Sequence, residues 1–486
     1  MTRLSADDLS NLLFDKLSDQ DIQSSLPLVG PIQISQQENA IVHGRGLITT
    51  RTIQPGEMIF VIQPTVYAPI ETVYQRWSTK GARGCRATLE EVAEEVLLEQ
   101  TKQCLQDNSN GEKQLQKRIS FMMQLGEENE DEVKLQRQEK DMEYILDALL
   151  GRTSAANSFN NESCTGNISD ANILSIIRRN AFGPDYHNYT AMEQTWNKQV
   201  RTQSGTDPYR RVLGLYPLAA IINHSCSANA VRVFAGELMM VHACTMIPRG
   251  EEIVWSYIPS SQPYHVRKNV IHSKFGFECC CDRCKKEEGA YDQVGNLRDR
   301  LVSLDTVNQS NLAGIIQSQY TLQEMTRMKE KLERDVLADG SLLNEVRRYL
   351  RVGYLNFYIN YFNVALSSIG LDQEDGPVDA TVTRQGVLEL ATQLHFALAS
   401  CNNACTEHLS ILHLSYELIS IIHSSSEDKN KTMVNVRFWT EQLKRAHMIR
   451  YGALGNDLED IREVMKHTRG VLRNLDGLSN ARWKFI

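Results

Sequence analysis

The sequence predicts an α+β protein in which a β-rich unit is split by a helical insertion and followed by an all-helical C-terminal part. Three observations predict this fold class. β-forming residues and tight turns fill residues 34–70 and return in residues 213–258. Between them, residues 71–150 carry Glu, Gln, Lys and Leu with apolar residues at helical spacing, and residues 292–486 are almost entirely helical in pattern. The length of 486 residues suits about three structural units.

Composition and charge narrow the class of protein. Hydrophobic residues make up 42% of the chain and charged residues 23%, proportions typical of a soluble globular protein. The 52 Lys and Arg residues against 60 Asp and Glu residues give a net charge of −8, which disfavours direct nucleic-acid binding. No stretch approaches the ~18 consecutive apolar residues of a membrane span, and the N-terminal residues do not resemble a secretory signal. We therefore expect a protein without membrane contact, located in the cytoplasm and/or the nucleus. We also expect a monomer.

The first β segment contains the run IVHGRGLITT, a turn at TIQPGE and the run MIFVIQP with its closing proline. The helical insertion follows. Its stretches LEEVAEEVLLEQTKQCL and DEVKLQRQEKDMEYILDALL carry apolar residues at helical spacing and contain no proline. Residues 153–172 are rich in Ser, Asn and Thr, which is the composition of an exposed loop.

The β character returns after a short helix predicted at ANILSIIRRNAF. The runs VRVF, LMMVHACTM and IVWSYI predict strands, with turns at residues 235–237 and at IPRGEE. Further on, LLNEVRRYLRVGYLNFYINYFNVAL and EHLSILHLSYELISIIH predict helices, with loop-like breaks at residues 370–377 and 424–430. Helical hairpins stacked as in tetratricopeptide arrays suit this length, although no clean repeat of ~34 residues is present.

The eleven cysteines predict metal binding rather than disulfides. An odd number of cysteines in a long chain without a secretory signal argues against a disulfide framework. The cysteines are then either metal ligands or buried thiols. Cys279, Cys281 and Cys284 form a C-x-C-x-x-C pattern whose thiolates can occupy three corners of a zinc tetrahedron. Cys226 is our candidate for the fourth ligand. Cys280 is the spare thiol of the cluster, although a slip in register that makes it a ligand instead stays open.

The tetrad Asn223-His224-Ser225-Cys226 ends the apolar run GLYPLAAII. Polar groups at the end of such a run must find hydrogen-bond partners, because a buried group without one costs about 1–3 kcal/mol. Taken alone, the tetrad is equally compatible with a turn that caps a helix and with a functional site.

Several short motifs then occur in a specific order along the chain. They are Gly44-Arg45-Gly46-Leu47, Pro55-Gly56-Glu57, Asn180-Ala181-Phe182, NHSC at residues 223–226, Gly250-Glu251-Glu252 with Ser256-Tyr257, and F-x-C-x-C-x-x-C from Phe277. Over about residues 34–286 this order resembles the SET-domain protein lysine methyltransferases, specifically the SMYD branch. The resemblance implies a SET domain split into residues 34–70 and 175–258, a helical insertion and loop at 71–174, a post-SET zinc-binding segment at 259–290 and a tetratricopeptide-like helical domain at 291–486.

The resemblance also implies S-adenosylmethionine as cofactor. The glycines let the backbone approach the cofactor closely, Asn223 and His224 bind through side-chain or backbone groups, and Phe277 offers a face to the adenine. The implied cofactor-binding residues are Gly44, Arg45, Gly46, Asn180, Asn223, His224, Tyr257 and Phe277. One structural Zn²⁺ held by Cys226, Cys279, Cys281 and Cys284 completes the implied cofactors.

Tyr257 is the implied catalytic residue. Methyl transfer to a lysine amine is an in-line displacement, so the protein mainly has to deliver a neutral amine in the right orientation. The tyrosine hydroxyl can orient that amine, and an apolar channel disfavours its protonated form, whose pKa is otherwise ~10.4. Phe182, Tyr257 and Phe275 match the aromatic lysine channel of the family.

The sequence departs from the SMYD branch in one module. That branch carries a MYND zinc finger in the insertion, but residues 71–150 contain only Cys85 and Cys104 and no histidine. These residues cannot supply the eight ligands of a two-zinc module. We therefore predict that the MYND finger is absent.

Three functions follow as alternatives. The first is an active protein-lysine N-methyltransferase acting on a histone or non-histone protein, with the helical domain forming a wall of the substrate cleft. The second is an inactive scaffold that keeps the SET fold and zinc while the C-terminal helices bind a partner protein. A site that no longer catalyses a reaction is expected to lose polar residues, because burying them costs stability. Tyr257, Asn180, Asn223 and His224 are all present, which favours the active enzyme over the scaffold. A zinc hydrolase is disfavoured because four thiolates leave no position for water.

Overall fold

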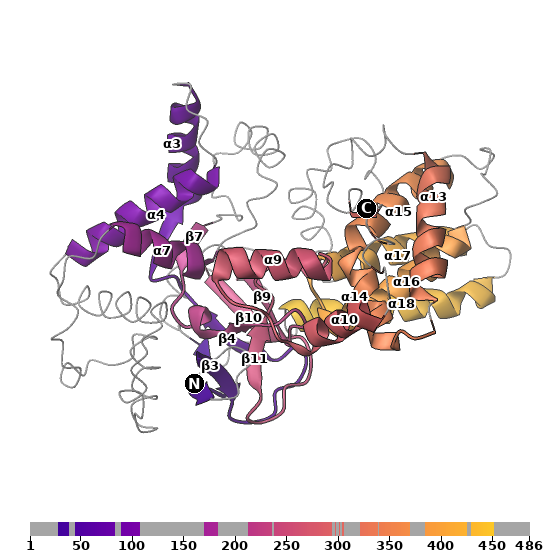
Figure 1. Ribbon diagram of the computed structural model, residues 1–486, viewed down its shortest axis with the longest axis horizontal. Helices are drawn as coiled ribbons and strands as arrows, with labels where there is room; N and C mark the ends of the chain where they lie inside the picture. The colour runs from indigo at the N-terminus through magenta and orange to yellow at the C-terminus, as the bar shows by residue number, and fades with distance from the viewer. Residues whose placement is uncertain are drawn as a thin grey trace. The chain divides into compact units, whose positions relative to one another are not determined.

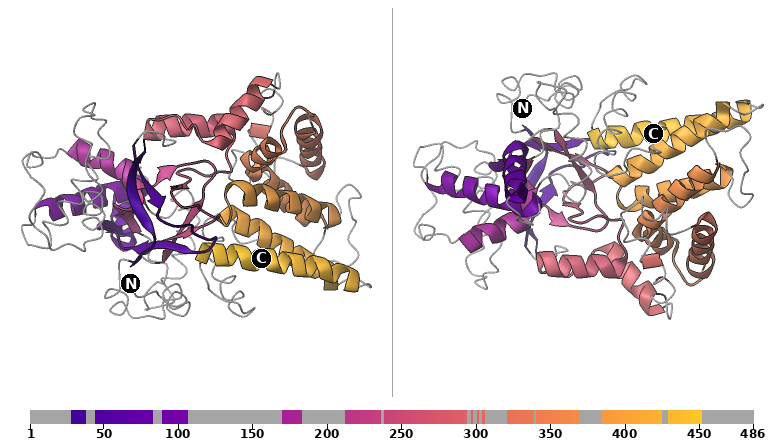
Figure 2. Two further views of the ribbon diagram at one scale, coloured as in Figure 1. Left: turned by 90° about the horizontal axis from the view of Figure 1, so that it is seen from below. Right: turned by 90° about the horizontal axis from the view of Figure 1, so that it is seen from above.

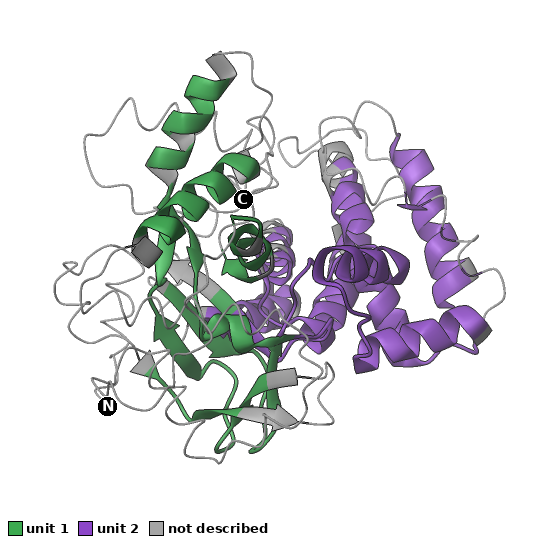
Figure 3. Cartoon of the chain, turned by 60° about the vertical axis from the view of Figure 1, so that its left-hand side comes forward, with its two compact units in different colours: residues 1–189, 202–223, 232–254 green, residues 190–201, 224–231, 255–486 purple. Residues whose placement is uncertain are grey.

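The chain divides into two compact units (Figure 3). The first comprises residues 1–189, 202–223 and 232–254, and the second comprises residues 190–201, 224–231 and 255–486. The structure is a computed structural model (Figures 1 and 2). It describes residues 28–37, 44–82, 89–106, 170–182, 212–235, 238–293, 297, 301, 304–305, 321–338, 340–369, 384–424 and 429–451.

Among the described residues, three small sheets carry the β structure. The first has the strand order β1 (Leu28–Val29), β4 (Met58–Ile62), β10 (Leu238–Ala243), β9 (Ala230–Ala235). The second has the order β2 (Ile32–Gln37), β3 (Gly44–Thr49), β11 (Glu252–Trp255), β8 (Asn223–His224). The third has the order β5 (Val66–Pro69), β7 (Val212–Leu215), β6 (Ala181–Phe182).

The two β-rich stretches of the sequence pair directly with each other. β4 lies antiparallel to β10, with Val61 opposite Met240, and β3 lies antiparallel to β11, with Leu47 opposite Ile253. The predicted β unit split by an insertion is therefore confirmed at the level of strand pairing.

β4 and β10 have continuous apolar sequences because their side chains are buried on both faces of the sheet. Phe60 and Val61 of β4 and Met239 and Met240 of β10 are all 0% exposed. Strands that are covered on both faces need apolar residues at every position rather than at every second one. These strands form the core of the first unit.

Two predicted turns close around glycines in the left-handed region. Gly56 has a φ of 83° and Gly250 a φ of 81°, a conformation that other residues adopt only with strain. The amide of Glu57 donates to the carbonyl of Gln54 at 3.0 Å, and the amide of Glu251 donates to the carbonyl of Pro248 at 3.1 Å. Glycine as the third residue of a β-turn with positive φ is the type II pattern.

The helical insertion is confirmed where the structure describes it. It forms α3 (Ile70–Ala82) and α4 (Leu89–Gln106), and α4 packs against α3, β5 and α7 (Asp170–Asn180). The predicted helix before the second β segment corresponds to α7, except that Ala181 and Phe182 leave the helix as β6. Residues 153–169 of the predicted loop lie outside the described residues, and residues 170–172 belong to α7 rather than to a loop.

The described residues of the second unit are mainly helical. Its elements are α9 (Tyr264–Phe275), α10 (Asp282–Gln293), α13 (Leu322–Lys331), the π-helical turn η4 (Leu332–Leu337), α14 (Asn344–Gly353), α15 (Leu355–Ile369), α16 (Arg384–Cys401), α17 (Thr406–Ser424) and α18 (Lys429–Tyr451). We call α13 to α18 the helical array. Within it α17 packs against α16 and α18, and α14 packs against α16 (Figure 1). Where the structure describes it, the predicted helical C-terminal part is confirmed. α9 and α10 are additional helices that the sequence pattern did not predict.

Four buried histidines pair within the helical array. His395 Nδ1 lies 2.8 Å from His408 Nε2, and His413 Nε2 lies 3.1 Å from His447 Nε2. The amide of Ala404 donates to His408 Nδ1 at 3.0 Å, so the proton of His408 sits on Nε2 and is donated to His395. All four side chains are at most 3% exposed.

No helix among the described residues combines the length and the apolar character that crossing a membrane requires.

Candidate functional site

The predicted cysteine quartet comes together in the second unit. The sulfur atoms of Cys226, Cys279, Cys281 and Cys284 all lie within 4.8 Å of one another. Cys226 Sγ is 4.0 Å from Cys279 Sγ and 3.6 Å from Cys284 Sγ. A zinc ion at ~2.3 Å from four sulfurs requires S···S edges of about 3.8 Å, so these spacings fit zinc. The quartet can therefore hold one zinc ion.

The neighbouring Cys280 differs from the quartet in its exposure. It is exposed, whereas Cys281 and Cys284 are 1% and 4% exposed. Because a structural metal site encloses its ligands, the structure favours the register in which Cys281 rather than Cys280 is a ligand.

A buried arginine lies against the cysteine quartet. Arg267, which is 0% exposed, donates from Nε to Cys226 Sγ at 3.3 Å and lies with Nη2 4.0 Å from Cys284 Sγ. Hydrogen bonds from the other three cysteines, with a smaller contribution from the Arg267 charge, hold the pKa of Cys226 well below its usual range. A lowered pKa favours the thiolate, which is the form that binds metal.

A second buried arginine lies inside residues 276–284, which we call the metal loop because they carry three of the four cysteines of the quartet. Arg283 stands between Cys281 and Cys284 and is 0% exposed. Its Nη1 donates to the carbonyl of Ser260 at 3.1 Å, and its Nη2 donates to the carbonyl of Tyr349 in α14 at 3.3 Å. The carboxylate of Glu287, which also pairs with Arg267, lies 3.3 Å from Arg283 Nε. The metal loop is thus tied to the helical array through one guanidinium group.

Four predicted residues gather in an aromatic cluster, also in the second unit. The ring of Tyr257 lies 5.2 Å from that of His224, 5.0 Å from that of Phe275 and 6.4 Å from that of Phe277, measured between centroids. Phe275 is the last residue of α9, and Gly276, with a φ of 78°, ends that helix. The left-handed glycine turns the chain so that Phe277 also faces the tyrosine.

The side chain of His224 is fully engaged within the protein. It is 0% exposed, its Nδ1 accepts the amide hydrogen of Tyr257 at 3.0 Å, and its Nε2 lies 3.3 Å from Cys226 Sγ. Of the two modes of cofactor contact that the sequence left open for His224, only the backbone mode is compatible with this arrangement.

Two predicted cofactor residues meet in the first unit. Asn223 donates from Nδ2 to Glu252 Oε1 at 2.6 Å. A Cβ atom on Gly46 would overlap that carboxylate oxygen and lie 3.2 Å from Asn223 Nδ2, so a side chain at this position requires the Glu252 carboxylate to shift. Burial raises the pKa of Glu252, and the hydrogen bond from Asn223 opposes this shift. Glu252 has no role in the sequence prediction, although it lies in the Gly-Glu-Glu motif.

The remaining predicted residues lie elsewhere in the first unit. Asn180 donates its side-chain amide to the carbonyl of Ile176 in its own helix at 3.1 Å. Phe182 lies with its ring centroid 6.3 Å from that of Tyr216 and 5.7 Å from the guanidinium carbon of Arg232. The backbone of Gly44-Arg45 lies in β3, and the side chain of Arg45 is outside the described part.

A family model identifies the β unit. The SET domain model matches residues 44–258, the stretch that contains β3 to β11. The chain contains a SET domain. Its match to SMYD3 of Mus musculus, a histone-lysine N-methyltransferase, has 32% identity over 82 residues and covers 17% of this chain and 19% of that protein. These findings confirm the resemblance to SMYD-like SET-domain proteins.

Two further relatives of the SET domain have similar partial coverage. The histone-lysine N-methyltransferase ASHR1 of Arabidopsis thaliana is 42% identical over 72 residues, which is 15% of each chain. The protein-lysine N-methyltransferase SMYD4 of Homo sapiens is 27% identical over 161 residues, covering 29% of this chain and 19% of that protein. The chain thus spans less than a quarter of the length of each of these curated relatives.

Among solved structures, the SET domain of LSMT bound to lysine and AdoHcy matches at 12% identity with a TM-score of 0.27, covering 96% of this chain and 92% of that chain. A TM-score this low does not support the assignment of a SET domain. That assignment rests on the family model and on the strand pairing. The predicted absence of a MYND finger stays a prediction, because Cys85 lies outside the described residues.

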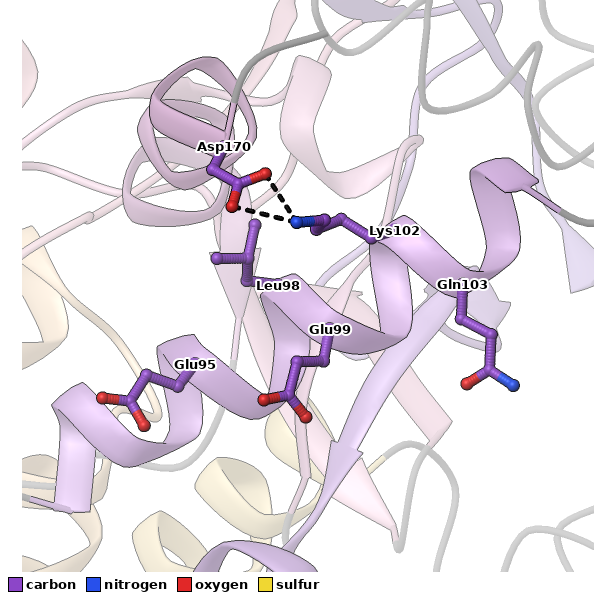
Figure 4. A pocket seen from close by; sticks show the side chains of 6 residues that line it. All are labelled: Glu95, Leu98, Glu99, Lys102, Gln103 and Asp170. Atoms are coloured by element: carbon purple, nitrogen blue, oxygen red, sulfur yellow. Dashed lines mark hydrogen bonds and ion pairs between the residues drawn. The ribbon is translucent and has the colours of Figure 1, made fainter. Parts of the chain in front are cut away.

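A shallow pocket of about 400 Å³ lies in the SET-domain insertion (Figure 4). Lys102 of α4 points toward Asp170 of α7, and Lys102 Nζ lies 2.8 Å from the Asp170 carboxylate (Figure 4). The lining residues are Glu95, Leu98, Glu99, Lys102, Gln103 and Asp170. None of the predicted site residues lines this pocket, so it is not the candidate site.

Replacing Gly46 with alanine is expected to destabilise the SET domain by about 1–3 kcal/mol, because the added methyl group must displace the Glu252 carboxylate from Asn223. Urea unfolding of the variant measures this loss. Gly289→Ala in α10 is the matched control, since a Cβ at that position meets nothing within 4 Å and its unfolding midpoint is expected to stay the same or rise. An unchanged midpoint for Gly46→Ala would contradict the packing described here.

Proposed function

We propose that this chain is an S-adenosylmethionine-dependent protein-lysine N-methyltransferase that acts on a lysine of a histone or non-histone protein. The SET domain at residues 44–258, together with the aromatic cluster around Tyr257, supports this proposal most directly. The relatives SMYD3 and ASHR1 are histone-lysine N-methyltransferases by name, and SMYD4 is a protein-lysine N-methyltransferase by name.

The cofactor assignment follows the family resemblance residue by residue. S-adenosylmethionine, when bound, supplies a methyl group activated by its positively charged sulfur. Gly46 lies beside Asn223, His224 follows Asn223 in β8, and Phe277 has a half-buried ring suited to stacking. The proposed set is Gly44, Arg45, Gly46, Asn180, Asn223, His224, Tyr257 and Phe277.

The chemistry proposed for the second unit centres on Tyr257. Its hydroxyl orients the substrate amine, while the ring of Phe275 at 5.0 Å provides an apolar wall that favours the neutral amine. In this role Tyr257 would hold the neutral amine in line with the methyl group that bound S-adenosylmethionine would supply, and the methylated amine would then release one proton to solvent. Phe182 is assigned to the lysine channel by resemblance alone.

The proposal also assigns roles to the cysteine quartet and to the helical array. The cysteine quartet is proposed as a post-SET structural zinc site, supported by the sulfur spacings of 3.6 and 4.0 Å. The helical array is proposed as a tetratricopeptide-like domain that binds a partner protein, supported by the packing of consecutive helices α16, α17 and α18.

Replacing Tyr257 with phenylalanine is expected to lower the rate of methyl transfer at least about a hundredfold, because one oriented polar group is removed from the reacting amine. Transfer of labelled methyl groups to histones and to cell lysate measures the rate, and calorimetry measures cofactor binding. Tyr264→Phe in α9 is the matched control, since its ring packs on Tyr291 rather than on the cluster.

The outcomes separate the alternatives. If the folded, metal-loaded protein does not bind S-adenosylmethionine, the proposed function is wrong. Cofactor binding without transfer to any substrate would favour the inactive scaffold that binds a partner through its helices.

A further inference from the structure

His224 stands between a metal ligand and the proposed catalytic residue. Its two ring nitrogens face different groups: Nδ1 lies 3.0 Å from the amide nitrogen of Tyr257, and Nε2 lies 3.3 Å from Cys226 Sγ. An amide N–H can only donate, so Nδ1 must be the acceptor and the imidazole proton must sit on Nε2. That proton points at the Cys226 sulfur, which is a better acceptor as a thiolate than as a thiol because it carries negative charge.

The imidazole has little freedom to take another position. His224 and Cys226 are both 0% exposed, and the imidazole ring also lies 6.1 Å from the ring of Phe277. Cys226 is held from its other side by Arg267 Nε at 3.3 Å. Tyr257 itself is half-buried, and the hydrogen bond from its amide to His224 Nδ1 restrains its backbone.

We propose that His224 is a positioning residue that transmits metal binding at the cysteine quartet to the backbone of Tyr257. The inference rests on the proposed function, in which Tyr257 orients the substrate amine. A metal ion fixes the sulfur of Cys226, the sulfur fixes the imidazole through the N–H···S bond, and the imidazole fixes the amide of Tyr257. Metal occupancy thereby sets how well the tyrosine hydroxyl is placed for the amine.

The first experiment needs no substitution. Hydrogen exchange of the Tyr257 amide is measured in the full chain with zinc and after chelation. Removing zinc is expected to speed this exchange at least about tenfold. The amide of Tyr358 in α15, which donates to the carbonyl of Tyr354 at 3.2 Å, serves as an internal reference for global unfolding. Unchanged exchange at Tyr257 after chelation would overturn the proposal.

Two substitutions of His224 separate its two contacts. Glutamine reaches the position of Nε2, and asparagine reaches the position of Nδ1. His224→Gln is therefore expected to keep the contact to Cys226 but to lose the acceptor for Tyr257. Exchange of the Tyr257 amide is then fast with or without zinc, and kcat falls at least about tenfold with little change in the KM for the peptide.

His224→Asn has the opposite expectation. It keeps an acceptor for the Tyr257 amide, but zinc leaves the protein faster during chelation, and the sulfur-to-cobalt charge-transfer band of the cobalt-substituted protein shifts. His272→Gln in α9, an exposed position, is the control for all these measurements.

The proposal fails if His224→Gln retains a metal-dependent exchange rate at Tyr257, or if both variants release zinc at the parent rate. Where one variant does not fold, the other variant and the chelation experiment on the parent together decide the proposal. Amide exchange and zinc release do not require methyl transfer, so a chain without transferase activity still tests the link.

Discussion

Cys281→Ser is expected to release the bound zinc and to unfold the loop between Gly276 and Cys284. Structural zinc contributes about 10–16 kcal/mol of apparent binding free energy at pH 7, and the loss of one of four thiolates removes most of the metal affinity. The loop has few apolar contacts that replace the metal, since only Cys281, Arg283 and Cys284 are buried in it. Metal analysis and limited proteolysis of the purified chain measure both effects.

Cys280→Ser is the matched control for the cysteine quartet. The substitution is the same at the adjacent residue, but the side chain of Cys280 is exposed, so one zinc per chain is expected to remain. If Cys280→Ser lost the metal while Cys281→Ser kept it, the register that left Cys280 as the spare thiol would be wrong. Absence of metal from the parent would refute the zinc site altogether.

Acidification from pH 7 to pH 5 is expected to destabilise the helical array. Burial lowers the pKa of His395 to about 4 and the pKa values of His408 and His447 to about 3, and the neighbouring Arg445, His395 and Arg450, respectively, add to these shifts. The unfolded chain takes up these protons near pH 6.5, whereas the folded chain takes them up only near pH 4 or 3. The free energy of unfolding therefore falls as the pH drops below about 6.5, by about 2 kcal/mol per histidine at pH 5.

Thermal unfolding followed by circular dichroism between pH 7.5 and 5 measures this dependence. His408→Gln removes one of the titrating groups and is expected to flatten the decline of the midpoint with falling pH. The exposed His272→Gln is expected to leave the slope unchanged. A midpoint that is constant over this range would show that the histidine pairs are not buried as described.

The β unit and the cysteine quartet were predictable because each has a strong local signal. β4 and β10 are buried on both faces, so their apolar runs stand out in the sequence. The spacing of Cys279, Cys281 and Cys284 is constrained by metal geometry, which leaves few alternative readings.

The buried charges could not be predicted in the same way. Arg267, Arg283 and Glu287 are at most 1% exposed, yet each stands among polar residues that read as solvent-facing. Their burial depends on cysteines and carbonyl groups far away in the sequence, and no local pattern encodes such a contact. The sequence pattern also did not predict α9 and α10. In α10 few apolar residues stand at helical spacing, as its sequence DRCKKEEGAYDQ shows.

The placement of Arg283 limits how this chain could exchange parts with its relatives. The arginine belongs to the metal loop and to the first turn of α10, but its guanidinium group reaches the carbonyl of Tyr349 in α14. The predicted boundary at residue 290 falls inside α10 (Asp282–Gln293). A chimeric protein joined at residue 290 would take the first residues of α10 from one parent and its last residues from the other. It would also take Arg283 and the α14 carbonyl that accepts its hydrogen bond from different parents. The metal loop and the helical array are therefore expected to be inherited as a single block.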